Sequence, residues 1–113
     1  MYSLTVRGKF DAAHHLPDYP GDCARIHGHT WLVETKISGE QLGPGMMLAD
    51  FRDIKSAWKR FDHQDLNVFF ECPTAEVLSR AIYVELLGTL PTDIEIRYVE
   101  IWESPDCSCR YSE

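Results

Sequence analysis

Three histidines in this chain, His14, His27 and His29, have the residue type and spacing of a metal site. Successive residues of a β-strand point to opposite faces, so His27 and His29, separated by one glycine, present both rings on one side. His14 has the same phase as the apolar residues Val6 and Phe10 and therefore also points inward. Three neutral imidazoles suit zinc, which at catalytic sites usually keeps three protein ligands and an open fourth position. The histidines thus predict a zinc site with room for water or a substrate.

Each of these histidines, taken alone, is more typical of a hydrogen-bonded core residue than of a metal ligand. Three inward imidazoles together favour the metal, because without one several buried ring nitrogens need other partners. His15 falls on the opposite strand face and is predicted to be a solvated neighbour.

Three residues separate Cys23 from the start of the His-x-His motif at His27, and an irregular loop that begins at Pro17 precedes Cys23. A thiol held beside a metal ion and imidazoles is favoured as the thiolate, which acts as a base or a nucleophile. Nothing else in the chain indicates secretion, so the four cysteines are predicted to be thiols rather than two disulfides. The other three cysteines are weaker evidence for a functional site. Cys72 lies in a predicted loop, and Cys107 and Cys109 form a lone Cys-x-Cys.

Two further groups of polar residues are candidates for chemistry. Asp62 directly precedes His63, and an aspartate beside a histidine orients the imidazole and helps it move protons near neutral pH. Such residues after a helix are also common as solvated caps. Glu103, at the end of the last long strand, is either a surface carboxylate or a buried acceptor for a ring with several N–H groups.

The elements that position these side chains follow from hydrophobic periodicity. Alternation predicts strands over residues 3–15 and 27–39, and β-forming residues predict strands over 93–103 and 109–112. Helical spacing predicts a helix of about three turns from Asp50 and a second from Thr74 to Gly88. The order ββααββ indicates an α+β domain with two helices on one face of an antiparallel sheet. The helix residues predicted to face the core are Phe51, Ile54, Trp58, Phe61, Val77, Leu78, Ala81, Val84 and Leu87.

Length and charge limit the possible functions. A chain of 113 residues supports one hydrophobic core, so residues 1–113 are predicted to be a single domain. The net charge of -7 argues against a nucleic-acid surface, where clustered Lys and Arg would neutralise phosphates. No segment reaches the roughly 20 apolar residues of a membrane span, and Met1 precedes a strand pattern rather than a signal peptide. We therefore expect no membrane partner and a cytoplasmic location.

An ordered series of short motifs runs from residue 10 to residue 103, most of the chain. Its members are Phe10-Asp11-Ala12-Ala13-His14, Cys23, His27-Gly28-His29, Asp50-Phe51 with Lys55, Asp62-His63 with Leu66-Asn67, Pro73-Thr74 with Glu76, and Trp102-Glu103. This series resembles the 6-pyruvoyltetrahydropterin synthase and 6-carboxytetrahydropterin synthase family. The resemblance implies the tunnelling fold (T-fold), in which subunits join their sheets into a barrel. It also implies a homohexamer of two trimeric rings with active sites at subunit boundaries.

Carried over by position, the resemblance implies Zn2+ as the cofactor and 7,8-dihydroneopterin triphosphate, a small-molecule pterin, as the substrate. The implied roles are zinc ligation by His14, His27 and His29, general acid/base catalysis by Cys23, proton relay by Asp62 and His63, and pterin binding by Glu103 with Thr74 nearby.

The family has two branches with different products. The carboxy branch cleaves the side chain to give 6-carboxytetrahydropterin, acetaldehyde and triphosphate, on the route to 7-deazaguanine compounds including queuosine. The pyruvoyl branch eliminates triphosphate and keeps the side chain. The short gap between Cys23 and His27 and the compact chain resemble the bacterial carboxy enzymes, so a zinc-dependent lyase of that branch is predicted. The chain departs from the family pattern at Phe61, at Ala75 and by one extra residue within 45–50. These departures affect the choice between the two branches and the details of the substrate pocket.

Two other functions compete with this prediction. A non-catalytic zinc-binding protein of the same fold would not require Cys23 or the Asp62-His63 pair. A zinc hydrolase fits the three histidines, but no glutamate base stands beside them in the sequence.

Overall fold

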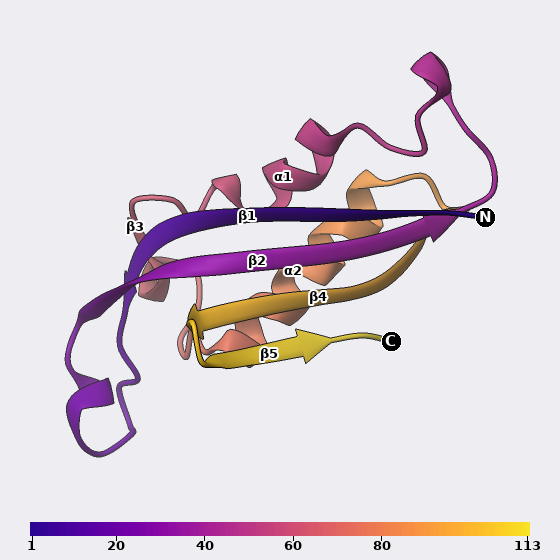
Figure 1. Ribbon diagram of the computed structural model, residues 1–113. Coiled ribbons are helices and arrows are strands. Elements are labelled where there is room, and N and C mark those ends of the chain that lie inside the picture. Colours follow the sequence, from indigo (N-terminus) through magenta and orange to yellow (C-terminus); the bar gives the residue numbers. More distant parts are fainter.

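The computed structural model describes residues 1–113 and contains one five-stranded sheet with both α-helices on one of its faces (Figure 1). The strand order across the sheet is β3-β1-β2-β4-β5, and the predicted α+β class is confirmed. The elements are β1 (Tyr2–His14), β2 (His27–Gly39), α1 (Phe51–Lys59), β3 (Gln64–Asp65), α2 (Ala75–Thr89), β4 (Glu95–Ser104) and β5 (Cys107–Tyr111), with 3-10 helices η1 (Asp22–Ala24), η2 (Pro44–Met46) and η3 (Leu66–Val68).

The sheet is mixed, which corrects the prediction of a wholly antiparallel ββααββ arrangement. β3 lies between the two helices in the chain and pairs in parallel with the end of β1, Gln64 opposite Ala12 and Asp65 opposite Ala13. The other neighbouring strands are antiparallel. A strand of two residues has no periodicity to detect, so hydrophobic pattern alone could not find it.

The register of β1 against β2 determines where the histidines meet. The two strands pair along their whole length, from Tyr2 opposite Gly39 to His14 opposite His27, and Ala12 lies opposite His29. Directly opposed and diagonal neighbours on one face of an antiparallel pair have side chains close enough to touch. The three predicted metal ligands therefore gather at the end of one hairpin.

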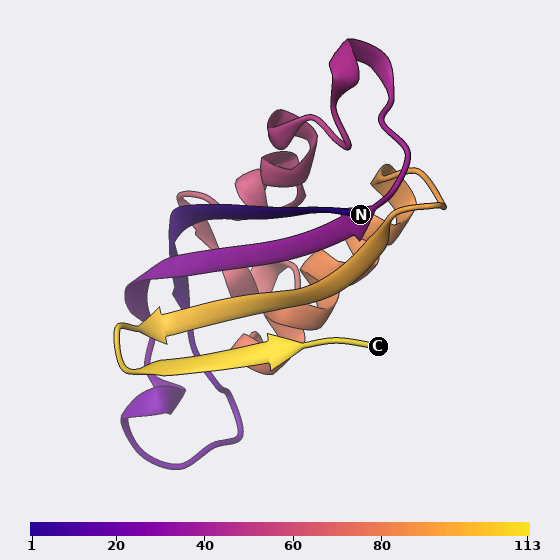
Figure 2. The ribbon, with the colours of Figure 1, turned by 45° about the vertical axis from the view of Figure 1, so that its right-hand side comes forward.

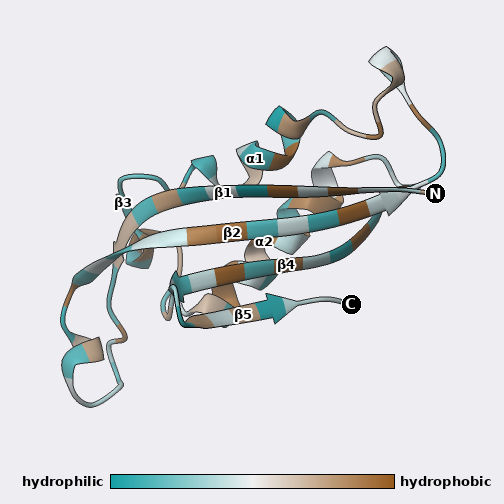
Figure 3. Ribbon diagram, in the orientation of Figure 1, coloured by the Kyte–Doolittle hydropathy of each residue, from teal (hydrophilic) through white to brown (hydrophobic).

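Alternating side chains build the core between the sheet and the helices. Figure 3 shows hydrophobic and hydrophilic bands alternating along the long strands, as expected for a sheet with one covered face. Trp31, Phe10 and Phe61 are fully buried, with the Phe10 ring stacked at 6.1 Å from Trp31 and tilted at 5.7 Å from Phe61. These aromatic side chains support the strands immediately beside the histidines.

The predicted core faces of the helices are partly wrong. Phe51, the first residue of α1, is exposed, and Phe61 is buried but lies in the turn after the helix. On α2 the predicted stripe residues Val84 and Leu87 are half exposed. α2 is apolar on more than one side, so spacing does not determine which side faces the sheet. The buried residues of α2 are Leu78, Ser79, Ile82, Tyr83 and Leu86.

Gly8 is required by the packing of α1 on β1. A Cβ at Gly8 would lie 2.8 Å from Cζ2 and 3.0 Å from Nε1 of the buried Trp58 ring. Gly8→Ala should lower the free energy of unfolding by about 1–3 kcal/mol through overpacking. Gly88→Ala, near the end of α2 with nothing within 4 Å, should raise it by about 0.5–1 kcal/mol. Urea unfolding of both variants measures the two changes in the free energy of unfolding. Equal changes in the two variants would contradict the packing role of Gly8.

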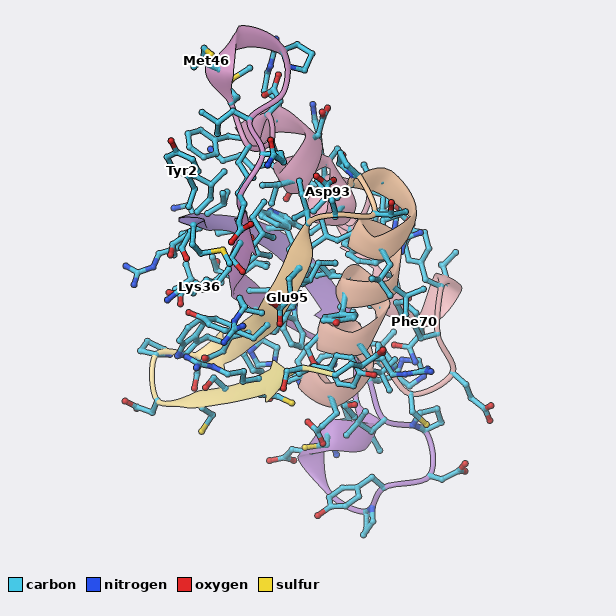
Figure 4. All side chains as sticks on the ribbon, turned by 90° about the vertical axis from the view of Figure 1, so that its right-hand side faces the viewer. Tyr2, Lys36, Met46, Phe70, Asp93 and Glu95 are labelled. Atoms are coloured by element: carbon cyan, nitrogen blue, oxygen red, sulfur yellow. The ribbon has the colours of Figure 1, made fainter.

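The opposite face of the sheet is not covered by a helix, as Figure 2 shows, and Lys36 of β2 lies on the side away from α2 in Figure 4. Two well-buried carboxylates on this face, Glu34 and Glu100, each bond to neighbouring strands. Glu34 accepts from the Tyr98 hydroxyl and from Arg7 Nε at 2.7 Å. Arg110 bonds Glu100 at 2.6 Å and stacks its guanidinium 3.8 Å from the Tyr98 ring. Side chains thus link the four long strands across the open face.

The hydrogen bond from Tyr98 is the main reason that the pKa of Glu34 lies below its usual value. A carboxylate with a lowered pKa stabilises the fold above its unfolded-state pKa and loses that contribution as the pH falls through its folded-state pKa. Tyr98→Phe should therefore lower the free energy of unfolding by about 1–2 kcal/mol near neutral pH. The loss should shrink as the pH falls through the lowered folded-state pKa of Glu34. Urea unfolding of Tyr98→Phe at about pH 7 and about pH 3 measures this loss of unfolding free energy, and Tyr2→Phe is the control. A loss that does not depend on pH would contradict the role of the hydrogen bond to Glu34.

Neither α-helix is long and apolar enough to cross a membrane.

Candidate metal centre

Four side chains converge at the end of the β1–β2 hairpin. One ligand atom from each of His14, His27, His29 and Glu103 lies within 4.8 Å of the others. The ring centroids are 4.5 Å apart for His14 and His27, 5.1 Å for His14 and His29, and 4.9 Å for His27 and His29. Three imidazoles and a carboxylate at these separations can hold a metal ion.

Backbone carbonyls select the tautomer of two of the rings. His14 Nδ1 lies 2.8 Å from the Pro73 carbonyl oxygen, and His27 Nδ1 lies 2.7 Å from that of Arg25. A carbonyl oxygen only accepts, so each Nδ1 must donate its N–H. The neutral rings then carry bare lone pairs on Nε2, which is the arrangement of metal-binding histidines held by an outer hydrogen bond.

The position of Glu103 indicates a cation between these groups. Its Oε1 is 3.2 Å from His14 Nε2 and 3.0 Å from His29 Nε2, yet both buried nitrogens lack a hydrogen-bond partner. With Nδ1 of His14 donating, its Nε2 lone pair faces a carboxylate oxygen, and two acceptors at this distance repel each other unless a proton or metal ion lies between them. The donor set and the two unpartnered nitrogens therefore fit a metal.

Burial lowers the pKa of His29, an effect that the Glu103 carboxylate opposes and the other two histidines reinforce. A lowered pKa keeps the ring neutral at physiological pH and leaves its lone pair free for a metal.

Trp31 and the start of α2 hold the histidines in place. The Trp31 ring meets His14 edge-on at 4.9 Å and His29 at 5.3 Å, and its Nε1 donates to the Ala12 carbonyl at 3.2 Å. Pro73, whose carbonyl accepts from His14, directly precedes Thr74. Thr74 is the N-cap of α2 and accepts from the Val77 N–H at 3.2 Å. Thr74, which was predicted to lie near a substrate, caps α2 next to the residue that holds the His14 ring.

Asn67 holds the backbone just after His14, a role that its place in the motif series did not reveal. Its side-chain oxygen accepts from the His15 N–H and its amide donates to the His15 carbonyl, both at 2.9 Å. The side chain thereby replaces a strand partner. His15 itself is half-buried and its Nδ1 is buried without a partner, which corrects the expectation of a fully solvated ring.

Cys23 lies outside the four-residue cluster. It is exposed on η1, in the loop joining β1 to β2, which Figure 1 shows at the same end of the sheet as β3. Its backbone carbonyl accepts from Leu16 N–H at 2.7 Å, and Arg25, two residues on, bonds His27. The loop is thus tied to a predicted ligand through its backbone, and the Cys23 thiol faces solvent in the single chain.

Asp62 and His63 form a second cluster with Asp11, outside the histidine site. His63 Nε2 lies 3.7 Å from Asp62 Oδ2, and His63 has a positive φ of 59°. A cavity of about 560 Å³ adjoins both clusters. Its lining residues are Asp11, Ala12, Ala13, Gly28, His29, Thr30, His63, Gln64 and Asp65. The single chain therefore brings His63 of the predicted relay pair and one predicted zinc ligand, His29, to a common open cavity that Asp62 and Cys23 do not line.

The fold and the site define an α+β protein of the T-fold type with a histidine–carboxylate cluster that can hold a metal at one end of its sheet. Residues 3–113 match the model of the 6-pyruvoyl tetrahydropterin synthase family, and the chain belongs to this family.

Curated relatives and solved structures agree with this assignment. The 6-carboxy-5,6,7,8-tetrahydropterin synthase of Haemophilus influenzae is 30% identical, with all of both chains covered. The Bacillus subtilis protein of that name is 30% identical over 97% of this chain and 84% of its own, and a putative one from Archaeoglobus fulgidus is 36% identical over 91% and 89%. The fold is also that of Caenorhabditis elegans 6-pyruvoyl tetrahydropterin synthase, with a TM-score of 0.79, 23% identity and coverage of 99% and 95%.

Proposed function

We propose that this protein is a zinc-dependent 6-carboxy-5,6,7,8-tetrahydropterin synthase. The observation that carries the proposal is the convergence of His14, His27 and His29 with Glu103 at the end of the β1–β2 hairpin. Whole-length relatives named for this activity support the carboxy branch. The reaction converts 7,8-dihydroneopterin triphosphate and water into 6-carboxytetrahydropterin, acetaldehyde and triphosphate. The side chain is oxidised while the ring is reduced, so no external redox partner is needed.

His14, His27 and His29 would hold the zinc ion through Nε2, since Nδ1 of His14 and of His27 is already committed to a backbone carbonyl. Zinc bound there would supply Lewis acidity toward the hydroxyl oxygens of the substrate side chain. Trp31 packs edge-on against the His14 and His29 rings and limits their rotation.

Cys23 and the pair Asp62-His63 would move the protons. The reaction removes a proton from a side-chain carbinol and delivers one to the ring, which calls for groups on both sides of the substrate. We assign the general acid/base to Cys23 and the relay to His63 with Asp62. In the single chain these groups occupy separate regions at one end of the sheet, which supports a site completed by assembly or by movement of the Cys23 loop.

Glu103 would bind the pterin. Its side chain is 38% exposed, so a ligand can reach it, and a carboxylate accepts two parallel hydrogen bonds from an amino group and a ring N–H. Its place beside the histidines would put the bound ring next to the metal. Thr74, which caps α2 at this point, would lie near the same end of the substrate.

The assembly proposed is a homohexamer of two trimeric rings acting in the cytoplasm on the route to queuosine or another 7-deazaguanine. The outer edge of β5, and that of β1 outside its two-residue pairing with β3, support joining of sheets between subunits, because unpaired edge groups favour pairing with another chain.

The test is a single incubation of the purified protein with 7,8-dihydroneopterin triphosphate, analysed by mass spectrometry. The proposal predicts the carboxypterin and acetaldehyde. A product that keeps the side chain after loss of triphosphate would assign the protein to the pyruvoyl branch. Unchanged substrate with folded, zinc-loaded protein would rule out both enzymes and leave a non-catalytic zinc-binding protein.

A further inference from the structure

Asp11 joins the relay pair to the sheet, and neither the family roles nor the sequence pattern assigned it a function. It lies on β1, three residues before His14 and on the opposite face. Its backbone N–H donates to Asp62 Oδ1 at 2.9 Å, and its carbonyl accepts from the His63 N–H at 2.6 Å. The two bonds attach the turn carrying Asp62 and His63 to the edge of β1, one residue before β3 begins to pair.

These backbone bonds hold His63 in an unusual conformation. Its φ of 59° lies in the left-handed region, which residues other than glycine keep only where the surrounding structure holds them there. Asp11 supplies one of those surroundings through its backbone. The β3 pairing that follows directly at Gln64 supplies another.

The Asp11 side chain has a separate role from its backbone. Thr30, its cross-strand partner on β2, donates a hydroxyl hydrogen bond to Asp11 Oδ1. This leaves the other carboxylate oxygen available. Ligand atoms of Asp11, Asp62 and His63 all lie within 4.8 Å of one another, so two carboxylates border one imidazole.

The imidazole has little else to orient it. The His63 side chain is 81% exposed, and its Nε2 is 3.7 Å from Asp62 Oδ2, beyond hydrogen-bond distance. Catalytic hydrogen bonds are often long in a free enzyme and shorten in the complex with substrate. Rotation of the exposed ring would bring a ring N–H within reach of either carboxylate.

We propose that Asp11 is a positioning residue for His63: its Thr30-fixed carboxylate orients the imidazole together with Asp62 and stabilises the positive charge that the ring acquires on taking a proton. This role rests on the proposed function, in which His63 relays protons. Asp11 and Thr30 line the same open cavity as His63, so the Asp11 carboxylate and the imidazole it is proposed to orient border one space that a substrate can enter.

The test is a double-mutant cycle between Asp11→Asn and His63→Gln. Asparagine keeps the backbone bonds and can still accept from Thr30, so only the carboxylate charge is removed. Asp11→Asn should lower kcat about 10–100-fold, the range for residues that orient a catalytic group, with KM and zinc content unchanged. In the His63→Gln background the same change should alter kcat by less than about two-fold, because Asp11 acts through His63. Asp93→Asn, in the turn between α2 and β4 (Figure 4), is the matched control and should leave kcat unchanged.

Nitrogen NMR of histidine-labelled protein gives a readout independent of turnover. The ring signals assigned to His63 by their loss in His63→Gln should shift in Asp11→Asn and stay in place in Asp93→Asn. An equal loss of kcat in both backgrounds, or unshifted His63 signals, would overturn the role of Asp11. If the His63 signals shift in Asp11→Asn but the wild-type protein does not convert the pterin, the proposed function is overturned. The orientation of His63 by Asp11 then still stands.

Discussion

His27→Ala is expected to remove both the bound zinc and the turnover. His27 contributes one of three converging rings, and its Nδ1 is already engaged with the Arg25 carbonyl, so Nε2 faces the site. Loss of one of three protein ligands should weaken zinc binding by more than about 100-fold, beyond the effect of losing an outer partner. Metal analysis after dialysis and product formation measure the two effects.

His63→Ala is the matched control for this prediction, because it removes an imidazole from the second cluster rather than from the metal centre. It should keep zinc and lose turnover. Zinc retained by His27→Ala, or lost equally from His63→Ala, would contradict the assignment of the ligands.

Cys23→Ala is expected to abolish turnover while leaving zinc in place. Cys23 is exposed on η1 and is not a member of the cluster proposed to hold the metal. Loss of a general acid/base should reduce kcat by about 10²–10⁴-fold. Turnover and zinc content are measured on the same preparation.

Exposed cysteines elsewhere provide the comparison for Cys23. Cys107→Ala, at the start of β5, should change neither zinc content nor turnover. If Cys23→Ala loses zinc as fully as His27→Ala, Cys23 is a metal ligand and the acid/base assignment is wrong.

Side-chain phase predicted that the three histidines share one face because strands alternate strictly. The even-numbered residues of β1 from Val6 to His14 face the helices, apart from the side-chain-free Gly8, and the odd-numbered residues of β2 from His27 to Ile37 do the same. Phase places rings on a face but does not set the register between strands. The pairing of His14 with His27 became visible only in the structure.

Other features had no signal of their own in the sequence. The packing side of α2 was ambiguous because two apolar stripes compete, and Val84 and Leu87 are half exposed as a result. β3 is too short for any period, and its pairing depends on the turn at His63. Asn67 and Asp11 act through contacts 52 and 51 residues away along the chain, which local spacing cannot reveal. The family resemblance supplied the roles of Cys23 and Glu103, which phase alone did not.

The most direct measurement is a zinc titration of metal-free protein, with acetaldehyde release from 7,8-dihydroneopterin triphosphate followed at each addition. If the histidine cluster is the zinc centre, acetaldehyde release should be absent without metal, rise linearly with added zinc, and reach a plateau at about one zinc per subunit. Acetaldehyde release by the metal-free protein, or a subunit that binds zinc fully and releases none, would contradict the claim that the histidine cluster is the metal centre of this reaction.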